Sequence, residues 1–209
     1  MTMNTKADLS RVANIAVDIG ERVFLVLLFV TAFFRFGGPY HLQWDDIVFL
    51  TAEAFTVLLI LVRRPGEMAM TPYPVLIALC GTALPLLTMA GGSGLIPETI
   101  GIGIMLLGLC ISLSSKGALN RSFGLVAADR GIKTRWTYAV VRHPMYAGYI
   151  VTQAGFLLLH PVIWNWVILP LAWAFQVLRV FAEERFMMRS ADYQRYADRV
   201  KYRLFPGLI

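Results

Sequence analysis

The chain has 209 residues, of which 57% are hydrophobic and only 15% are charged, and its mean hydropathy is +0.63. Soluble globular domains carry about 25% charged residues, so this composition excludes an ordinary soluble protein and predicts an all-α integral membrane protein. The net charge of +6 would suit a protein that binds nucleic acid, but an excess of Lys and Arg on the cytoplasmic side of a membrane protein explains it without such a partner. We expect membrane lipids as partners, no nucleic acid and no obligate protein partner.

Six apolar blocks follow one another along the chain, each near the roughly 20 residues that a membrane-spanning helix requires. In order they are residues 15–36, 47–62, 74–90, 96–113, 145–159 and 162–181. Only His160 and Pro161 separate the last two blocks, which predicts a tight antiparallel helical hairpin. Residues 1–10 are polar and no small-residue cleavage pattern follows the first block, so we expect the first span to stay in the mature protein.

The positive charges predict the orientation of these spans. Of the 19 Lys and Arg residues, only Arg35 falls in a segment on the opposite side from the others. We therefore predict six spans with both termini in the cytoplasm, and expect a bacterial inner membrane. Residues 1–115 would form a four-span region, and residues 116–209 a second region with a cytoplasmic loop, the hairpin and an interfacial C-terminal helix. Ser190 is the expected cap of that helix.

A few side chains inside the apolar blocks stand out. Gly108 and Ser112 are four residues apart, a small-xxx-small spacing that favours close helix packing. Glu53 lies inside the second block, where an acid is costly; a functional role and a partnered structural role remain equally open. Cys80 and Cys110 have no metal-ligand spacing, so we expect no metal site.

The stretch from Arg142 to Tyr146 joins a basic, polar segment to an apolar one. Proline is tolerated in the first turn of a helix, so a helix starting at Pro144 would present its free N–H groups beside Arg142 and His143. Such a helix end is a natural anion site. The simpler alternative is that Arg142 and His143 only anchor a membrane helix at the interface.

A second polar cluster ends the sixth block. Arg179 and Glu183 are four residues apart and share one helix face, either as a simple ion pair or as part of a site. The hairpin would bring them to the same membrane surface as His143 and Tyr146. The resulting pocket, open to both water and lipid, would suit a water-soluble charged cofactor that meets a lipophilic substrate.

These motifs together resemble the C-terminal half of the isoprenylcysteine carboxyl methyltransferase family, to which phospholipid N-methyltransferases are related. The resemblance covers about residues 118–209. It is carried, in order, by Asn120-Arg121-Ser122-Phe123, Tyr138, Arg142-His143-Pro144-Met145-Tyr146-Ala147-Gly148, Arg179-xxx-Glu183-Glu184 and Tyr193-xx-Tyr196-xx-Arg199-Val200.

The resemblance implies S-adenosylmethionine as the methyl donor, with S-adenosylhomocysteine as its product, bound on the cytoplasmic side. By position, Arg179, Glu183 and Glu184 are the catalytic candidates, and Arg179 resembles the residue that meets the substrate. The candidate cofactor-binding residues are Arg130, Gly131, Ile132, Lys133, Tyr138, Arg142, His143, Pro144, Met145, Tyr146 and Glu183.

The acceptor is a lipophilic small molecule in this interpretation, and its reacting group is open. A carboxylate is ionised at neutral pH and needs no base, and Arg179 would hold it. An ammonium group would need a base, for which Glu183 and Glu184 are the candidates. The presence of Arg179 favours the carboxylate.

Three other functions fit parts of the same pattern. The first is a phospholipid or amine N-methyltransferase. The second is an NADPH-dependent reductase, because membrane sterol reductases have a similar His-Pro-x-Tyr region. The third is a non-catalytic membrane component. The charged residues argue against it, because they cluster at one face and do not line a path across the bilayer.

Overall fold

The computed structural model describes residues 5–38, 40–62, 72–119, 134 and 136–208, and every regular element in these ranges is a helix. In chain order they are α1 (Thr5–Arg35), α2 (Trp44–Val62), α3 (Pro72–Ala83), the 3₁₀ helix η1 (Leu84–Leu87), α4 (Glu98–Leu119), the 3₁₀ helix η3 (Trp136–Ala139), α5 (Pro144–Leu159), α6 (Ile163–Met187) and α7 (Ala191–Arg199). The all-helical prediction is confirmed for this part of the chain.

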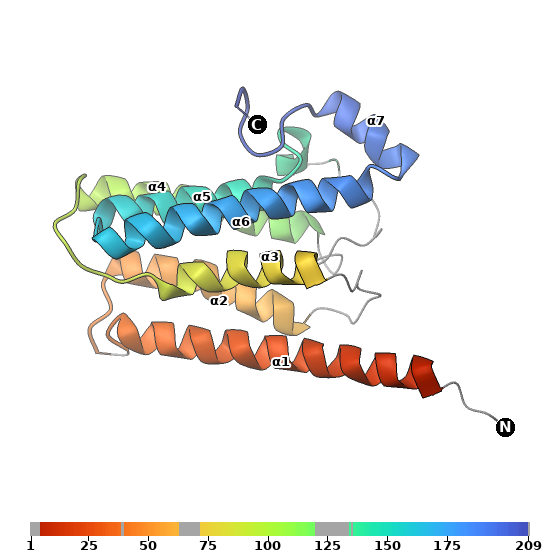
Figure 1. The fold of residues 1–209 in the computed structure, drawn as a ribbon. Helices are drawn as coiled ribbons and strands as arrows, with labels where there is room; N and C mark the ends of the chain where they lie inside the picture. Colours follow the sequence, from red (N-terminus) through yellow and green to blue (C-terminus); the bar gives the residue numbers. More distant parts are fainter. Residues whose placement is uncertain (1–4, 39, 63–71, 120–133, 135, 209) are drawn as a thin grey trace.

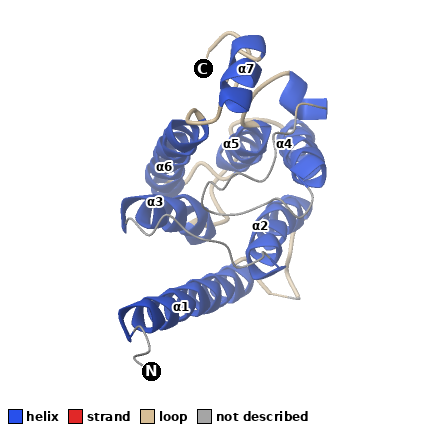
Figure 2. Cartoon of the chain, turned by 90° about the vertical axis from the view of Figure 1, so that its right-hand side faces the viewer, coloured by secondary structure: helices blue, strands red, loops and turns tan. Residues whose placement is uncertain are grey.

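Helices α1 to α6 lie side by side, and each runs antiparallel to the next along the chain (Figure 1). Viewed along the bundle, α4, α5 and α6 form one layer, α2 and α3 pack beneath it, and α1 lies outermost (Figure 2). Helix α7 lies at the end of the bundle where α1 begins, α5 begins and α6 ends. Each of the six predicted apolar blocks falls on one of the helices α1 to α6, with η1 completing the third.

The outer surface of the bundle is apolar in the way that lipid contact requires. Helices Glu98–Ala118 and Ile163–Met187 have the length and hydropathy to span a membrane, whereas Leu76–Leu87 and Pro144–Leu159 are apolar but shorter. Helix α1 exposes Phe24, Leu27 and Phe34 to its surroundings. Two candidate spans among the described residues support a membrane protein, and the six-span topology stays a prediction.

The third apolar block does not form one continuous α-helix. Helix α3 ends at Ala83, and the chain continues as η1 with Pro85 in its first turn. A proline lacks the N–H that an α-helix needs at an interior position, so the backbone tightens there into a 3₁₀ turn. The hydroxyl of Thr88 then donates to the carbonyl of Pro85 at 2.8 Å and closes the turn.

Helices α4 and α5 pack backbone against backbone through small residues. A Cβ atom added at Gly108 would lie 2.4 Å from the backbone nitrogen of Thr152 and 2.6 Å from the carbonyl oxygen of Gly148. One added at Gly148 would lie 2.7 Å from the nitrogen of Ser112. The close packing predicted for Gly108 and Ser112 is therefore confirmed, and α5 is its partner.

Aromatic rings fill the core at the end of the bundle away from α7. Phe49 and Phe156 stack with ring centroids 4.3 Å apart, and the Phe36 ring lies within 5.8 Å of both. These three residues come from α5, α2 and the end of α1, so this cluster fixes the N-terminal helices against the C-terminal ones. The boundary expected between residues 115 and 116 falls inside α4. The division into two functional regions stays a prediction.

We expect Gly108→Ala to destabilise the protein, because its methyl group would have to displace the backbone of α5. Overpacking of this kind costs about 1–3 kcal/mol of unfolding free energy. Thermal unfolding of the purified protein measures the change. Gly103→Ala on the same helix is the matched control, because a Cβ there meets nothing within 4 Å. Its midpoint should stay the same or rise, since alanine favours a helix more than glycine does. Equal midpoints for the two variants would contradict the packing described.

Candidate functional site

The helix start predicted at Pro144 is confirmed, and a second segment of the chain covers it. Pro144 occupies the first turn of α5, and His143 stands at the cap position without capping through its side chain. The backbone N–H groups of Arg142 and His143 donate to the carbonyls of Tyr202 and Arg203 at 2.9 and 2.8 Å. The chain after α7 therefore returns to the junction that precedes α5.

Glu183 joins the two helices of the predicted hairpin. The hydroxyl of Tyr146 on α5 donates to Glu183 Oε1 at 2.6 Å, and Arg179 Nε donates to the same oxygen at 3.0 Å. The Arg179 guanidinium also lies over the Tyr146 ring, 5.2 Å from its centroid. The two sequence clusters thus converge, as predicted, at one end of the bundle.

Glu184 is the most heavily paired carboxylate of the site. Its oxygens lie 2.8 Å from Arg142 Nε and 2.7 Å from Arg203 Nε, and Tyr193 donates to it at 3.5 Å. Both Glu184 and Arg142 are buried. With two guanidinium partners, this carboxylate holds the segment before α5, the end of α6 and the segment after α7 in one arrangement.

His143 lies between the two carboxylates. Its Nε2 is 3.3 Å from Glu184 Oε1 and its Nδ1 is 3.9 Å from Glu183 Oε2. Nε2 is buried, and in the described part of the chain it makes no hydrogen bond of good geometry. Each ring nitrogen of His143 therefore faces one of the two carboxylates.

Tyrosines of α7 fix the entrance to α5. The hydroxyl of Tyr196 donates to the carbonyl of Tyr138 in η3 at 2.7 Å, so α7 covers η3. Burial raises the pKa of Tyr196 to about 12 and also raises the pKa of Tyr138, so both phenols stay protonated at neutral pH. Tyr193, Tyr196 and Val200 form one buried cluster in this segment. Ser190 stands at the predicted cap position, but its side chain makes no capping hydrogen bond.

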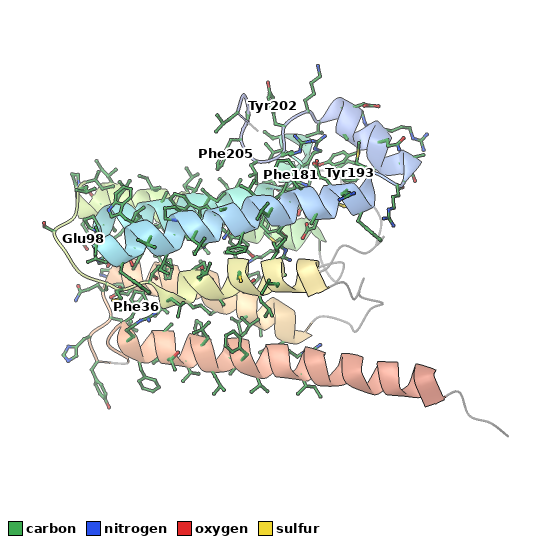
Figure 3. The ribbon with its side chains drawn as sticks, in the orientation of Figure 1. Phe36, Glu98, Phe181, Tyr193, Tyr202 and Phe205 are labelled. Carbon is green, nitrogen blue, oxygen red and sulfur yellow. The ribbon has the colours of Figure 1, made fainter. Side chains whose placement is uncertain are left out.

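The structure describes most of the predicted site residues but not all of them. Tyr138, Arg142, His143, Pro144, Met145, Tyr146, Arg179, Glu183 and Glu184 all lie at this end of the bundle. The loop residues Arg130, Gly131, Ile132 and Lys133 lie outside the described residues, as does the Asn120–Phe123 motif. Figure 3 shows Tyr193, Tyr202, Phe205 and Phe181 gathered around the same end, with Glu98 and Phe36 at the opposite one.

Sequence reasoning missed two features of the site. Arg203, the second cation on Glu184, lies beyond the last helix, where no periodicity indicates what it contacts. The second feature is a small, partly open pocket lined by Met145, Tyr146 and Arg179. It extends between α2, α3, α5 and α6 and is lined in addition by Glu53, Thr56, Gly81, Thr82, Tyr149, Gln153 and Gln176.

A separate polar cluster lies at the other end of the bundle. Ligand atoms of Asp45, Asp46 and His160 come within 4.8 Å of one another. The backbone N–H of Gly91 donates to His160 Nδ1 at 3.0 Å, so the ring proton is on Nε2 and is donated to Asp45. Since neither ring nitrogen then has a free lone pair, this geometry serves to tie α2 to the α5–α6 turn and not to bind a metal.

Residues 97–193 match the family model for phospholipid methyltransferases. This family is the one described above as related to the family that the sequence motifs resemble. The matched segment contains Tyr138, the Arg142–Tyr146 stretch and residues 179–184. No curated protein matches the chain significantly. The likeness to a family of membrane methyltransferases thus belongs to the segment that builds most of this site.

We expect Glu184→Gln to lower the thermal unfolding midpoint strongly. The change removes the charge that compensates buried Arg142, and an uncompensated buried charge costs about 3–5 kcal/mol. Asp192→Asn is the matched control, since the Asp192–Arg195 pair on α7 is exposed and surface pairs contribute little. A Glu184→Gln protein as stable as Asp192→Asn would rule out the anchoring role of Glu184.

Proposed function

We propose that this protein is an S-adenosylmethionine-dependent methyltransferase that acts on a lipophilic small molecule at the cytoplasmic surface of a membrane. The observation that carries the proposal is the coincidence of two independent features. The segment that matches phospholipid methyltransferases is the one whose polar residues converge at a single end of an otherwise apolar bundle.

The polar groups at this end fit the chemistry of S-adenosylmethionine. That molecule carries a carboxylate, an ammonium group, ribose hydroxyls and a sulfonium centre. His143 and Arg142 stand at the start of α5, each next to the carboxylate of Glu184. Glu183 keeps 17% of its side chain exposed, which leaves a carboxylate edge for a hydroxyl or ammonium group. Met145 and Tyr146 provide an apolar wall next to these groups.

Once bound, the sulfonium supplies a methyl group that is already electrophilic. The chain then has to bring an acceptor within about 3–3.5 Å and exclude water. Tyr146 and Arg179 are placed for the first task, because each contacts Glu183 and also lines the pocket that leads into the bundle. The buried walls of that pocket serve the second.

The arrangement also supports the proposed orientation in the membrane. Arg142, Arg179, Arg199 and Arg203 belong to the end of the bundle that carries the site, whereas Arg35 ends α1 at the opposite side. An excess of positive charge marks the cytoplasmic side. We therefore propose six spans, with the site and both chain ends on the cytoplasmic side.

The test of the function is ligand-induced thermal stabilisation of the purified protein. A ligand that binds only the folded state stabilises it by about 2.7 kcal/mol at 100 times its Kd. We expect S-adenosylhomocysteine to raise the unfolding midpoint and NADPH to leave it unchanged.

Variants locate the binding within the site. His143→Ala and Glu183→Gln should reduce the shift caused by S-adenosylhomocysteine, whereas Glu98→Gln, at the exposed start of α4 on the far side of the bundle, should keep it. Stabilisation by NADPH in place of S-adenosylhomocysteine would support a reductase and refute the proposal. An S-adenosylhomocysteine shift that is identical in all three variants would place the methyl donor elsewhere.

A further inference from the structure

The segment that follows α7, residues 200–208, runs back along the outside of the bundle. In both ribbon views it lies on the face of the α4–α5–α6 layer that is opposite to α2 and α3 (Figure 1, Figure 2). Leu204 belongs to the buried cluster that contains Met145 and Val180, and Phe205 packs against that cluster. The segment therefore covers the side of α5 and α6 and does not simply extend from their ends into water.

The position of this contact along α6 places the segment near the boundary of a bilayer. Val180 lies seven residues before Met187, the last residue of α6, which corresponds to about 10 Å along the helix axis. The headgroup layer of a bilayer adds roughly 5–7 Å on each side of the hydrocarbon core. With this end of the bundle at the membrane surface, as proposed above, residues 204 and 205 lie at the level where headgroups meet hydrocarbon.

A β-turn ends the segment and presents one apolar side chain on the outside. The backbone N–H of Leu208 donates to the carbonyl of Phe205 at 3.2 Å and closes the turn. Pro206 occupies the first central position, and Gly207 at the second has a φ of +83°, which is the pattern of a type II turn. Phe205 is half-buried, whereas 78% of the Leu208 surface is exposed.

Two exposed aromatic residues lie on the same side of the bundle. Figure 3 shows Phe181 and Tyr202 there, together with Phe205. Phe181 and Tyr202 are both more than 40% exposed, at 46% and 43%. The Arg203 guanidinium lies over the Phe181 ring, 5.3 Å from its centroid, so the segment and α6 form one continuous surface. Tyrosine is enriched where one end of a side chain meets lipid and the other meets water.

The charges of the segment indicate what kind of partner covers this surface. Residues 199–208 include Arg199, Lys201 and Arg203 and no acidic residue. Arg199 and Lys201 are exposed. Anionic headgroups of the cytoplasmic leaflet attract such basic residues, and apolar side chains beside cations are typical of segments that bind a membrane surface. A second copy of the chain would bring the same cations to a symmetric contact, and the two sets would repel each other.

We propose that residues 201–208 dock on anionic lipid headgroups, with Tyr202 and Leu208 at the apolar boundary and Lys201 against the phosphates. The apolar residues of α7 itself, Tyr193 and Tyr196 among them, are already buried, which leaves this lipid contact to the segment after it.

The same segment completes the candidate site on its inner side. The carbonyls of Tyr202 and Arg203 accept from the backbone N–H groups of Arg142 and His143, and Arg203 pairs with Glu184. Lipid contact on the outer side therefore favours the closed site. This effect on the methyl donor rests on the proposed function, whereas the lipid contact does not.

The lipid contact is tested with a bimane fluorophore on a single cysteine, in a Cys80→Ala/Cys110→Ala background. The full-length protein is placed, one copy per nanodisc, in phosphatidylglycerol. We expect a label at Leu208→Cys to be quenched by brominated lipid and protected from aqueous iodide. Ala191→Cys, at the exposed start of α7, is the matched control and should show the opposite pattern.

The role of charge is tested with the same label at position 208. Lys201→Gln should lower the ratio of docked to undocked segment about fivefold, which is the contribution of one basic residue at an anionic surface. Arg195→Gln removes the same charge from the exposed pair on α7 and should leave the quenching unchanged. Replacing phosphatidylglycerol with phosphatidylcholine should reduce the quenching by brominated lipid in the parent protein.

Three fluorescence results would overturn the lipid contact. The first is a label at position 208 that iodide quenches as strongly as the label at position 191. The second is equal quenching of both labels by brominated lipid. The third is protection of position 208 only in discs that hold two copies of the protein, which would assign the surface to a second copy.

The effect on the site is measured as the affinity for S-adenosylhomocysteine in the two lipids. We expect about fivefold tighter binding in phosphatidylglycerol than in phosphatidylcholine, because only the closed fraction of the protein binds. Leu208→Asp should remove this difference. Equal affinities of the wild type in both lipids would overturn the coupling. Absence of binding in both lipids would refute the methyltransferase function, while the fluorescence results would still decide the lipid contact.

Discussion

Two adjacent carboxylates at the end of α6 hold the candidate site together. Glu183 accepts from Tyr146 and Arg179, and so joins the two helices of the hairpin. Glu184 pairs with Arg142 and Arg203, and so joins the segments that flank α5 and follow α7. Neighbouring side chains on a helix point about 100° apart, so Glu183 and Glu184 contact different segments of the chain although they are adjacent in sequence. Three segments that are distant in the sequence meet at these two side chains.

The rest of the bundle gives this arrangement a rigid base. Because Gly108 and Gly148 let α4 and α5 approach to backbone contact, the start of α5 has little freedom to shift relative to α4. At the far end, the hydrogen bond between His160 and Asp45 ties the hairpin turn to α2. The helices that carry Tyr146 and Glu183 are thus held at both ends, and the pocket between them keeps polar walls inside an apolar protein.

Much of this structure could be predicted from the sequence, because the strongest patterns are local. Apolar length located the six helices, Pro144 marked the start of α5, and the four-residue spacing of Arg179 and Glu183 placed them on one face. Pairings that depend on the path of the chain in space could not be predicted, and the contact between Arg203 and Glu184 is one of them. Gln153 and Gln176 could be predicted only in part. Polar residues inside apolar blocks indicate which helix face points inward, but they do not show which residues they bond.

The hydrogen bonds from Arg142 and His143 to residues 202 and 203 have a consequence for how the protein matures. During translation, all helices of the bundle emerge from the ribosome before those two carbonyls do. The site at this end of the bundle can therefore close only after every helix has been synthesised, when the segment after α7 folds back onto the start of α5.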